Sequence, residues 1–188
     1  MSRRDQIKMT DEEVLAFLDE QRTVICATAG RDGWPHLMPL WYVVRDGELW
    51  SWTYAASQKV KNLERDPRAT VQVEAGTEYQ ELRGVMFKCE VELVRDADGV
   101  AELGLEIFAR YGGVDPGGLA DDVRAMVGKQ AAKRVGLRFV ERERADRVDV
   151  AVDHDVALEH HAAQLVVVLA GLDLQRRARV TLEVERLL

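Results

Sequence analysis

Residues 36–54 read HLMPLWYVVRDGELWSWTY, and this stretch decides the class of fold. At its centre, Asp46 and Gly47 form one of the strongest dipeptide signals for a tight β-hairpin turn. Glu48–Tyr54 then alternates between two faces, which is the pattern of a half-buried antiparallel strand. On the other side of the turn, His36–Val44 is rich in apolar and β-branched residues. The stretch therefore predicts two antiparallel strands joined by a two-residue turn.

The residues before this hairpin predict a helix and one more strand. Thr10 and Glu13 have the spacing of a capping box, and apolar residues recur behind them at helical spacing. A helix is therefore expected over Thr10–Gln21. Thr23–Ala29 is rich in β-forming residues and is followed by a glycine turn at residues 30–33. Three consecutive antiparallel strands with short turns favour a β-meander.

The residues after the hairpin mix short helices with strands. Ser57 is expected as the N-cap of a short helix that ends at Asp66, because a proline follows. The remaining expected elements are strands at Ala69–Ala75 and Leu82–Val94, helices at Ala97–Tyr111 and Leu119–Lys133, and a strand at Arg134–Val140. This order indicates a mainly β fold, a small barrel decorated with helices. A doubly wound sheet is disfavoured because no GxGxxG motif follows a strand.

The composition argues against several classes of protein. The formal net charge of −7 makes nucleic acid and anionic membranes poor partners for the chain as a whole. Cys26 and Cys89 are the only cysteines and do not form a CxxC motif, which disfavours a disulfide scaffold and a four-cysteine zinc site. The first eleven residues lack an apolar signal segment, so a cytoplasmic protein is expected. No metal site, paired-carboxylate site or nucleophile is recognisable, and the catalytic residues stay unassigned.

One candidate site lies at the start of the helix that Ser57 begins. Lys59 and Lys61 stand in its first turns, where a positive charge opposes the helix dipole. A bound phosphate would remove this penalty, because the free amides of a helix start favour an anion. The alternative is an ordinary surface helix with solvated lysines.

A second candidate is the strand that begins near His36. Pro35 and Pro39 interrupt its hydrogen bonding, which leaves backbone groups free for a planar ligand or simply protects an edge strand against aggregation. His36 is a conceivable ligand or acid, although a lone histidine on a strand is more often structural. The nearby aromatic residues suit the wall of a flat heterocycle, a core or a dimer interface; they are Trp34, Trp41, Trp50, Trp52 and Tyr54.

Three segments together carry a resemblance to a known family. They are residues 23–53 (TVICATAGRDGWPHLMPLWYVVRDGELWSWT), 57–76 (SQKVKNLERDPRATVQVEAG) and 81–96 (ELRGVMFKCEVELVRD). In order and spacing, from about Met9 to Val140, the chain resembles the F-420-dependent oxidoreductases of the flavin/deazaflavin superfamily, which are related to pyridoxamine 5′-phosphate oxidase. The resemblance implies a split β-barrel of the FMN-binding type that forms a homodimer, with two cofactor sites at the subunit interface.

The same resemblance implies a function and a set of binding residues. The expected cofactor is coenzyme F-420, with FMN as the alternative, and the expected reaction is hydride transfer to a small unsaturated or quinone-like substrate. A non-catalytic protein that binds F-420 or haem is the remaining alternative. The family's phosphate-binding helix start corresponds here to Ser57, Lys59, Lys61 and Asn62. The strand whose backbone contacts the cofactor ring corresponds to Leu37, Met38, Pro39, Leu40 and Trp41.

Two expectations concern the organisation of the whole chain. Residues 1–143 are expected to form the cofactor-binding barrel, and residues 144–188 a divergent tail that adds little to it. Apolar runs at Leu165–Leu169 and Val180–Val184 leave open that the tail pairs with the barrel or with a second subunit. Homodimerisation is also expected from the strand face that carries Trp50 and Trp52, which would need an apolar partner.

Overall fold

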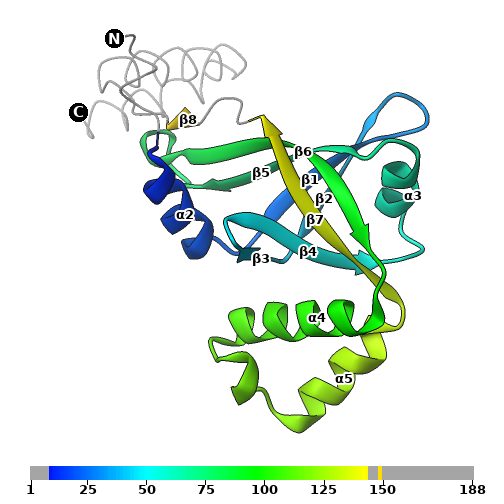
Figure 1. Cartoon of the computed structure of the whole chain (residues 1–188). Coiled ribbons are helices and arrows are strands. Elements are labelled where there is room, and N and C mark those ends of the chain that lie inside the picture. Colours follow the sequence, from blue (N-terminus) through cyan, green and yellow to red (C-terminus); the bar gives the residue numbers. More distant parts are fainter. Residues whose placement is uncertain (1–8, 144–147, 150–188) are drawn as a thin grey trace, which may run out of the picture. The chain divides into compact units, whose positions relative to one another are not determined.

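The structure of the chain, a computed structural model, describes residues 9–143 and 148–149 (Figure 1). The predicted tail at residues 144–188 lies outside the described residues, except for the two-residue strand β8 (Val148–Asp149). No helix among the described residues is long and apolar enough to cross a membrane.

The chain divides into two compact units. One consists of residues 1–75 and 83–149, and the other of residues 76–82 and 150–188. The described residues of the second unit contain a single turn of 3-10 helix, η1 (Tyr79–Glu81). The sheet, the helices and the candidate site described below all belong to the first unit.

The strands of the first unit form one antiparallel sheet. Its hydrogen-bonded order is β2-β1-β5-β6-β7-β4-β3, and β8 pairs with β6. In chain order the strands are β1 (Val24–Ala29), β2 (Pro35–Leu40), β3 (Tyr42–Arg45), β4 (Glu48–Tyr54), β5 (Arg68–Ala75), β6 (Arg83–Val94) and β7 (Arg134–Glu143). The mainly β architecture predicted from the alternating sequence is therefore confirmed.

The sheet closes on itself at Trp41. Strands β2 and β3 stand at opposite ends of the hydrogen-bonded order, yet only Trp41 separates them in the chain. The two ends of the sheet must therefore meet, and β2 does approach β4. The hydroxyl of Ser51 on β4 donates to the carbonyl oxygen of Trp41 at 2.7 Å and fixes this corner. The result is a barrel.

This closure corrects two predictions about the strands. The stretch His36–Val44 is two strands rather than one, because the chain turns at Trp41, where the indole leaves the sheet and stacks on a helix. The predicted three-strand meander holds in part: β2 pairs with β1 and β3 pairs with β4 as expected, but the middle strand is broken, so β2 and β4 are not hydrogen-bonded neighbours. The hairpin between β3 and β4 does form where Asp46 and Gly47 predict it, with positive φ at both residues.

The helices form close to the predicted ranges. They are α2 (Asp11–Glu20), α3 (Gln58–Arg65), α4 (Ala97–Gly112) and α5 (Asp121–Ala131), with a short 3-10 turn η2 (Pro116–Gly118) between the last two. The capping box predicted for the first helix is present, because Thr10 and Glu13 each accept the other's backbone N–H. The apolar face of α2 packs into the barrel core with Phe17 and Leu18 fully buried.

A hydrogen-bonded cluster ties the C-terminal end of α2 to the rest of the barrel. Arg110 on α4 donates to the carbonyl oxygens of Leu18, Asp19 and Gln21, which the helix end leaves unsatisfied. The phenol of Tyr42 also donates to the carbonyl oxygen of Leu18 at 2.6 Å. Burial raises the pKa of Tyr42 to about 12, so this phenol stays protonated as a donor.

The helical hairpin of α4 and α5 covers the outer face of β3 and β4 (Figure 1). It builds a second apolar core in which Trp52 is buried against Leu103, Ile107 and Val127. Trp50, on the same strand face, is half-buried against this core. The prediction that Trp50 and Trp52 form an exposed face that needs a second subunit is therefore wrong, because the chain's own helices cover that face.

Candidate functional site

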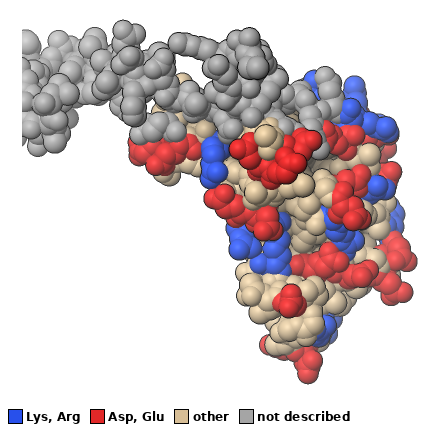
Figure 2. Space-filling model, turned by 60° about the vertical axis from the view of Figure 1, so that its left-hand side comes forward, with Lys and Arg blue, Asp and Glu red and all other residues tan. Residues whose placement is uncertain are grey.

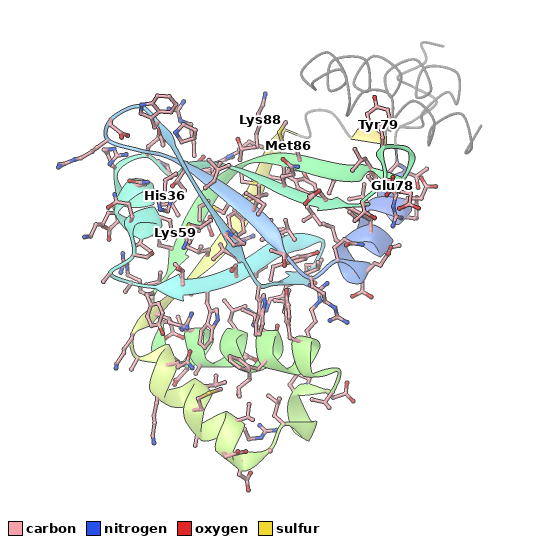
Figure 3. All side chains as sticks on the ribbon, turned by 180° about the vertical axis from the view of Figure 1, so that it is seen from behind. His36, Lys59, Glu78, Tyr79, Met86 and Lys88 are labelled. Carbon is pink, nitrogen blue, oxygen red and sulfur yellow. The ribbon has the colours of Figure 1, made fainter. Side chains whose placement is uncertain are left out.

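The candidate site lies where the chain passes from β4 into α3 (Figure 3). Strand β4 ends at Tyr54, and Ser57 begins the helix two residues after Ala55. His36 on β2 pairs in register with Thr28 on β1, and the hydroxyl of Thr28 accepts a hydrogen bond from Asn62 of α3. The structure thus places the two candidate segments, the helix start and the proline-containing strand, next to one another.

Lys59 is buried, with only 6% of its surface exposed. Its ammonium group donates to the hydroxyl of Thr53 on β4 at 3.1 Å, and no carboxylate pairs with it among the described residues. Burial lowers the pKa of Lys59, and the positive charge of Arg134 lowers it further, whereas the nearby Cys26 has the opposite effect. Burial also raises the pKa of the Cys26 thiol to about 11, so this neighbour supplies no anion at neutral pH. The barrel therefore holds a desolvated cation that lacks a counter-ion.

Ser57 occupies the N-cap position that the sequence predicts, but its hydroxyl does not cap the helix. Its backbone is extended, as an N-cap requires, yet its side chain makes no capping hydrogen bond. The hydroxyl oxygen is buried and has no partner. Because buried polar groups are nearly always hydrogen-bonded, this free hydroxyl at a helix start indicates a place for a ligand.

The other two residues predicted at this helix have different environments. Asn62 is completely buried, donates to the hydroxyl of Thr28 on β1 at 3.0 Å, and accepts from the side chain of Gln58 at 2.9 Å. These bonds fasten α3 to the barrel and use part of the amide. Lys61 is exposed on the outer surface of the helix. The structure thus separates a buried pair, Lys59 and Asn62, from a solvated lysine.

The five residues predicted on the proline-containing strand lie along an edge. Strand β2 has one hydrogen-bonded neighbour, β1, among the described strands, which leaves backbone groups on its other side free of the ladder. Leu37, Met38 and Pro39 are exposed, and Leu40 is half-buried. The indole of Trp41 turns away toward α4 and stacks on Tyr111, with ring centroids 4.2 Å apart. The edge is therefore open to a planar ligand through its backbone, as the two prolines predict.

Arg134, which sequence analysis did not single out, lies beside this site. It is the first residue of β7 and pairs with Tyr54 across the ladder. The guanidinium carbon lies 4.3 Å from the ring centroid of Trp52 and 4.2 Å from that of Tyr54. No local pattern around residue 134 reveals that Arg134 lies here, because its place depends on the pairing of β4 with β7, which comes 80 residues later in the chain.

Among the hollows of the described surface, two lie near the strands discussed above. One of about 540 Å³ lies between the end of β4 and α5 and is lined by Tyr54, Asp122, Ala125, Met126, Lys129, Gln130 and Lys133. Another, of about 680 Å³, lies over β1, β5 and β6, where Ala27, Thr70 and Lys88 are among its walls. On the face shown in Figure 2, basic and acidic side chains are intermixed. No cluster of His, Cys, Asp and Glu among the described residues could hold a metal ion.

Residues 10–150 match the family of pyridoxamine 5′-phosphate oxidase. The chain belongs to this family. Its barrel is thus the split β-barrel of that fold. Among curated proteins, none matches the chain.

Solved structures agree with this assignment. A conserved hypothetical protein of Mycobacterium tuberculosis is 36% identical, with a TM-score of 0.68 over 81% of this chain and 99% of its own. A haem storage protein of Vibrio cholerae is 15% identical, with a TM-score of 0.55 over 70% of this chain and 89% of its own. An F420 reductase is 22% identical, with a TM-score of 0.51 over 68% of this chain and 92% of its own. The last two identities are low, so these two structures establish the fold alone.

Proposed function

We propose that this protein is an oxidoreductase that uses coenzyme F-420 to transfer a hydride to a small unsaturated or quinone-like substrate. The proposal rests on two buried groups: the ammonium group of Lys59, which has no carboxylate partner, and the hydroxyl of Ser57, which has no hydrogen-bond partner. Both stand at the start of α3, where members of the family it resembles hold the cofactor phosphate. An F420 reductase among the structures of the same fold is in keeping with this choice of cofactor.

The residues present fit an anionic group. A buried charge is costly unless it is paired, and Lys59 has only the neutral hydroxyl of Thr53. A phosphate would supply the counter-charge to Lys59 and an acceptor for the hydroxyl of Ser57. Asn62 would act indirectly, because its bonds to Thr28 and Gln58 fix α3, and hence Lys59, against the barrel.

The division of labour follows from these contacts. When bound, a deazaflavin supplies the hydride chemistry, so the protein needs no nucleophile of its own. Lys59 and Ser57 would hold the phosphate, and the free backbone edge of Leu37–Trp41 would orient the ring. A cofactor fixed at both ends presents one face to a substrate.

The direct test is a titration of the purified protein with F-420 and with FMN, side by side. We expect tighter binding of F-420, and we expect Lys59→Ala to weaken it about tenfold or more, since a charge-assisted contact contributes roughly 1.5–3 kcal/mol. Lys61→Ala, on the exposed side of the same helix, provides the comparison and should have a smaller effect. Unchanged affinity in the Lys59→Ala/Lys61→Ala double variant would rule out this phosphate site.

The remaining alternatives give different results in the same preparation. Tighter binding of FMN, with a flavin absorbance spectrum, would indicate an FMN enzyme of this fold. Tight binding of F-420 without reduction of any compound in a panel of enones and quinones would indicate a cofactor-binding protein. A Soret band after addition of haemin would place the chain with haem-binding proteins of this fold, such as the haem storage protein of Vibrio cholerae.

We also propose that the protein is a homodimer through the outer face of the sheet formed by β2, β1, β5 and β6. The strand registers place Leu37 beside Ala27, and Pro39 beside Ile25, on this face. Leu37 is 53% exposed, although it is a large apolar side chain in a regular strand. The apolar part of this face lies on β1 and β2, whereas β5 and β6 add polar residues such as Thr70, Gln72 and Lys88. An exposed apolar strip of this kind favours a partner, and a second copy of the chain supplies a matching one.

A further inference from the structure

Arg134 is held in place from two sides. The rings of Trp52 and Tyr54 flank its guanidinium group at 4.3 and 4.2 Å from their centroids. From α5, the side-chain oxygen of Gln130 accepts a hydrogen bond from Nη2 at 2.8 Å. Stacking and a hydrogen bond to a planar group restrict an arginine far more than they restrict a solvated side chain. The guanidinium is therefore pre-organised before any ligand arrives.

The charge of Arg134 is not neutralised by the protein. Two other stacked arginines are paired with acids: Arg45 lies over Trp50 and binds Glu106, and Arg138 lies over the same ring and binds Glu48. Arg110, over Tyr42, donates instead to backbone carbonyl oxygens. Within the described part of the chain, Arg134 makes no ion pair, and its buried Nε has no hydrogen-bond partner. Arg134 therefore keeps an N–H donor that the protein does not use, whereas Arg45 and Arg138 donate to carboxylates.

A second unpaired cation stands close by. Lys59 donates to Thr53 on the barrel side of β4, whereas Arg134 stacks on Trp52 and Tyr54, whose side chains point to the other face of this strand. The charge of Arg134 reaches Lys59 strongly enough to contribute, after burial, to lowering its pKa. Two cations near one another repel, and a bound anion relieves this repulsion. Neither Lys59 nor Arg134 is paired with a carboxylate among the described residues, so the protein itself supplies no anion for them.

We propose that Arg134 is an anion-binding residue for a phosphate-bearing ligand, and that Trp52, Tyr54 and Gln130 position it. The identity of the ligand as F-420 rests on the proposed function, whereas the anion site itself does not. The hollow of about 540 Å³ beside it, which shares Tyr54 and Gln130 with the arginine, gives a ligand room on that side.

The test measures binding of two probes, F-420 and inorganic phosphate, to the full-length protein and to Arg134→Gln. Phosphate should raise the melting temperature of the wild type, and the substitution should abolish that rise and weaken F-420 binding about tenfold. Arg138→Gln is the matched control, because it removes a stacked arginine of the same strand that is already paired with acids. It should bind both probes as the wild type does. Wild-type affinity for both probes in Arg134→Gln would overturn the inference.

Two further readouts keep the outcome interpretable. If Arg134→Gln does not fold, Arg134→Lys keeps the charge but loses the planar fork, and we expect it to bind phosphate more weakly than the wild type; equal binding would overturn the inference. The pKa of Lys59, followed by NMR, should rise in Arg134→Gln, which removes the neighbouring charge, but not in Arg134→Lys, which keeps it. If the wild type binds neither F-420 nor FMN but phosphate stabilises it through Arg134, the proposed function fails and the anion site stands. If Arg134→Gln binds F-420 as tightly as the wild type does, the anion site at Arg134 fails and the proposed function stands.

Discussion

Lys59 is the residue where stability and binding oppose each other. Its ammonium group is buried with one neutral hydrogen bond, which costs free energy in the unliganded protein. Such a cost persists in proteins chiefly where function requires it. In the proposed site, this buried charge would be available to a ligand at the expense of the stability of the unliganded protein.

Replacing Lys59 by methionine should separate the two effects. Lys59→Met keeps the apolar length of the side chain and removes the buried charge, so the free energy of unfolding without ligand should rise by about 1 kcal/mol or more. The same variant should lose cofactor affinity. Urea unfolding and a binding titration measure the two quantities, and Lys61→Met, at an exposed position, should change stability by less than about 0.5 kcal/mol. A less stable Lys59→Met would mean that the ammonium group contributes to the fold.

The cost of burying Lys59 should also depend on pH. Burial holds its pKa below 10.5 in the folded chain, so between that lowered value and 10.5 the unfolded chain binds more protons. The stability of the wild type relative to Lys59→Met should therefore rise as pH increases through this window and level off above it. Unfolding free energies measured in parallel at several pH values from about 8 upward check the sign. A difference that stays constant with pH would contradict the assignment of this effect to Lys59.

The sequence predicts some of these residues and not others. Lys59 and Ser57 stand in a short local pattern, a hydroxyl residue and lysines at a helix start, and that pattern is sufficient to select them. The pattern does not separate the buried Lys59 from the exposed Lys61, because burial depends on which side of α3 faces the barrel. No local signal marks Arg134, since the two rings that flank it, those of Trp52 and Tyr54, belong to β4.

At the scale of elements, α4 packs on β4 so closely that one position admits no side chain. A Cβ atom at Gly104 would lie 2.5 Å from Cζ3 of Trp52 and 2.9 Å from Cγ1 of Val127. A glycine inside a helix ordinarily weakens it, so the close approach explains its presence here. The second core therefore depends on the absence of a methyl group.

Two alanine substitutions test this packing. Gly104→Ala should lower the free energy of unfolding by about 1–3 kcal/mol, because the buried indole must move. Gly128→Ala is the control inside α5, where nothing lies within 4 Å of a new Cβ, and it should stabilise the protein by about 0.5–1 kcal/mol. Denaturation curves for both give the comparison. A stabilised Gly104→Ala would show that α4 does not pack on Trp52 as closely as described.

Most elements follow from local signals, whereas the exception has a long-range cause. Strand β4 and the hairpin at Asp46 and Gly47 form as predicted, since alternation and turn chemistry act over a few residues. The break at Trp41 was not predicted, because an aromatic residue between two apolar strands resembles continuous strand. Its stacking on Tyr111, 70 residues later, is what moves it out of the sheet.

For the whole molecule, the proposed homodimer gives the clearest test. Leu37→Asp places a charge on the outer sheet face, and burying it between two copies would be unfavourable, so the variant should sediment as a monomer at micromolar concentration without ligand. Leu15→Asp makes the same change at a similarly exposed leucine, on α2, and should remain dimeric. A dimeric Leu37→Asp would exclude this face, and a monomeric wild type that still binds cofactor would exclude the dimer.

The class of fold was predictable at this scale, whereas the long-range pairing of the strands was not. Antiparallel strands with late helices favour a barrel, and a barrel is present. Consecutive strands pair at β1–β2 and β3–β4 as sequence proximity suggests, but β1 also pairs with β5 and β4 with β7, which it does not suggest. Such long-range pairs are decided by how the apolar faces enclose one core, which no short window contains.

The position of β7 between β6 and β4 has a consequence for protein synthesis. Glu48 on β4 meets Arg138 on β7 across 90 residues of chain. Until residues 134–143 leave the ribosome, the nascent chain carries two incomplete sheets, and the edges of β4 and β6 lack their partner. Exposed strand edges pair readily with other chains. A ribosome that stalls within α5 would therefore release an aggregation-prone fragment, and a chaperone that covers strand edges would matter most during the few seconds in which α4 and α5 are made.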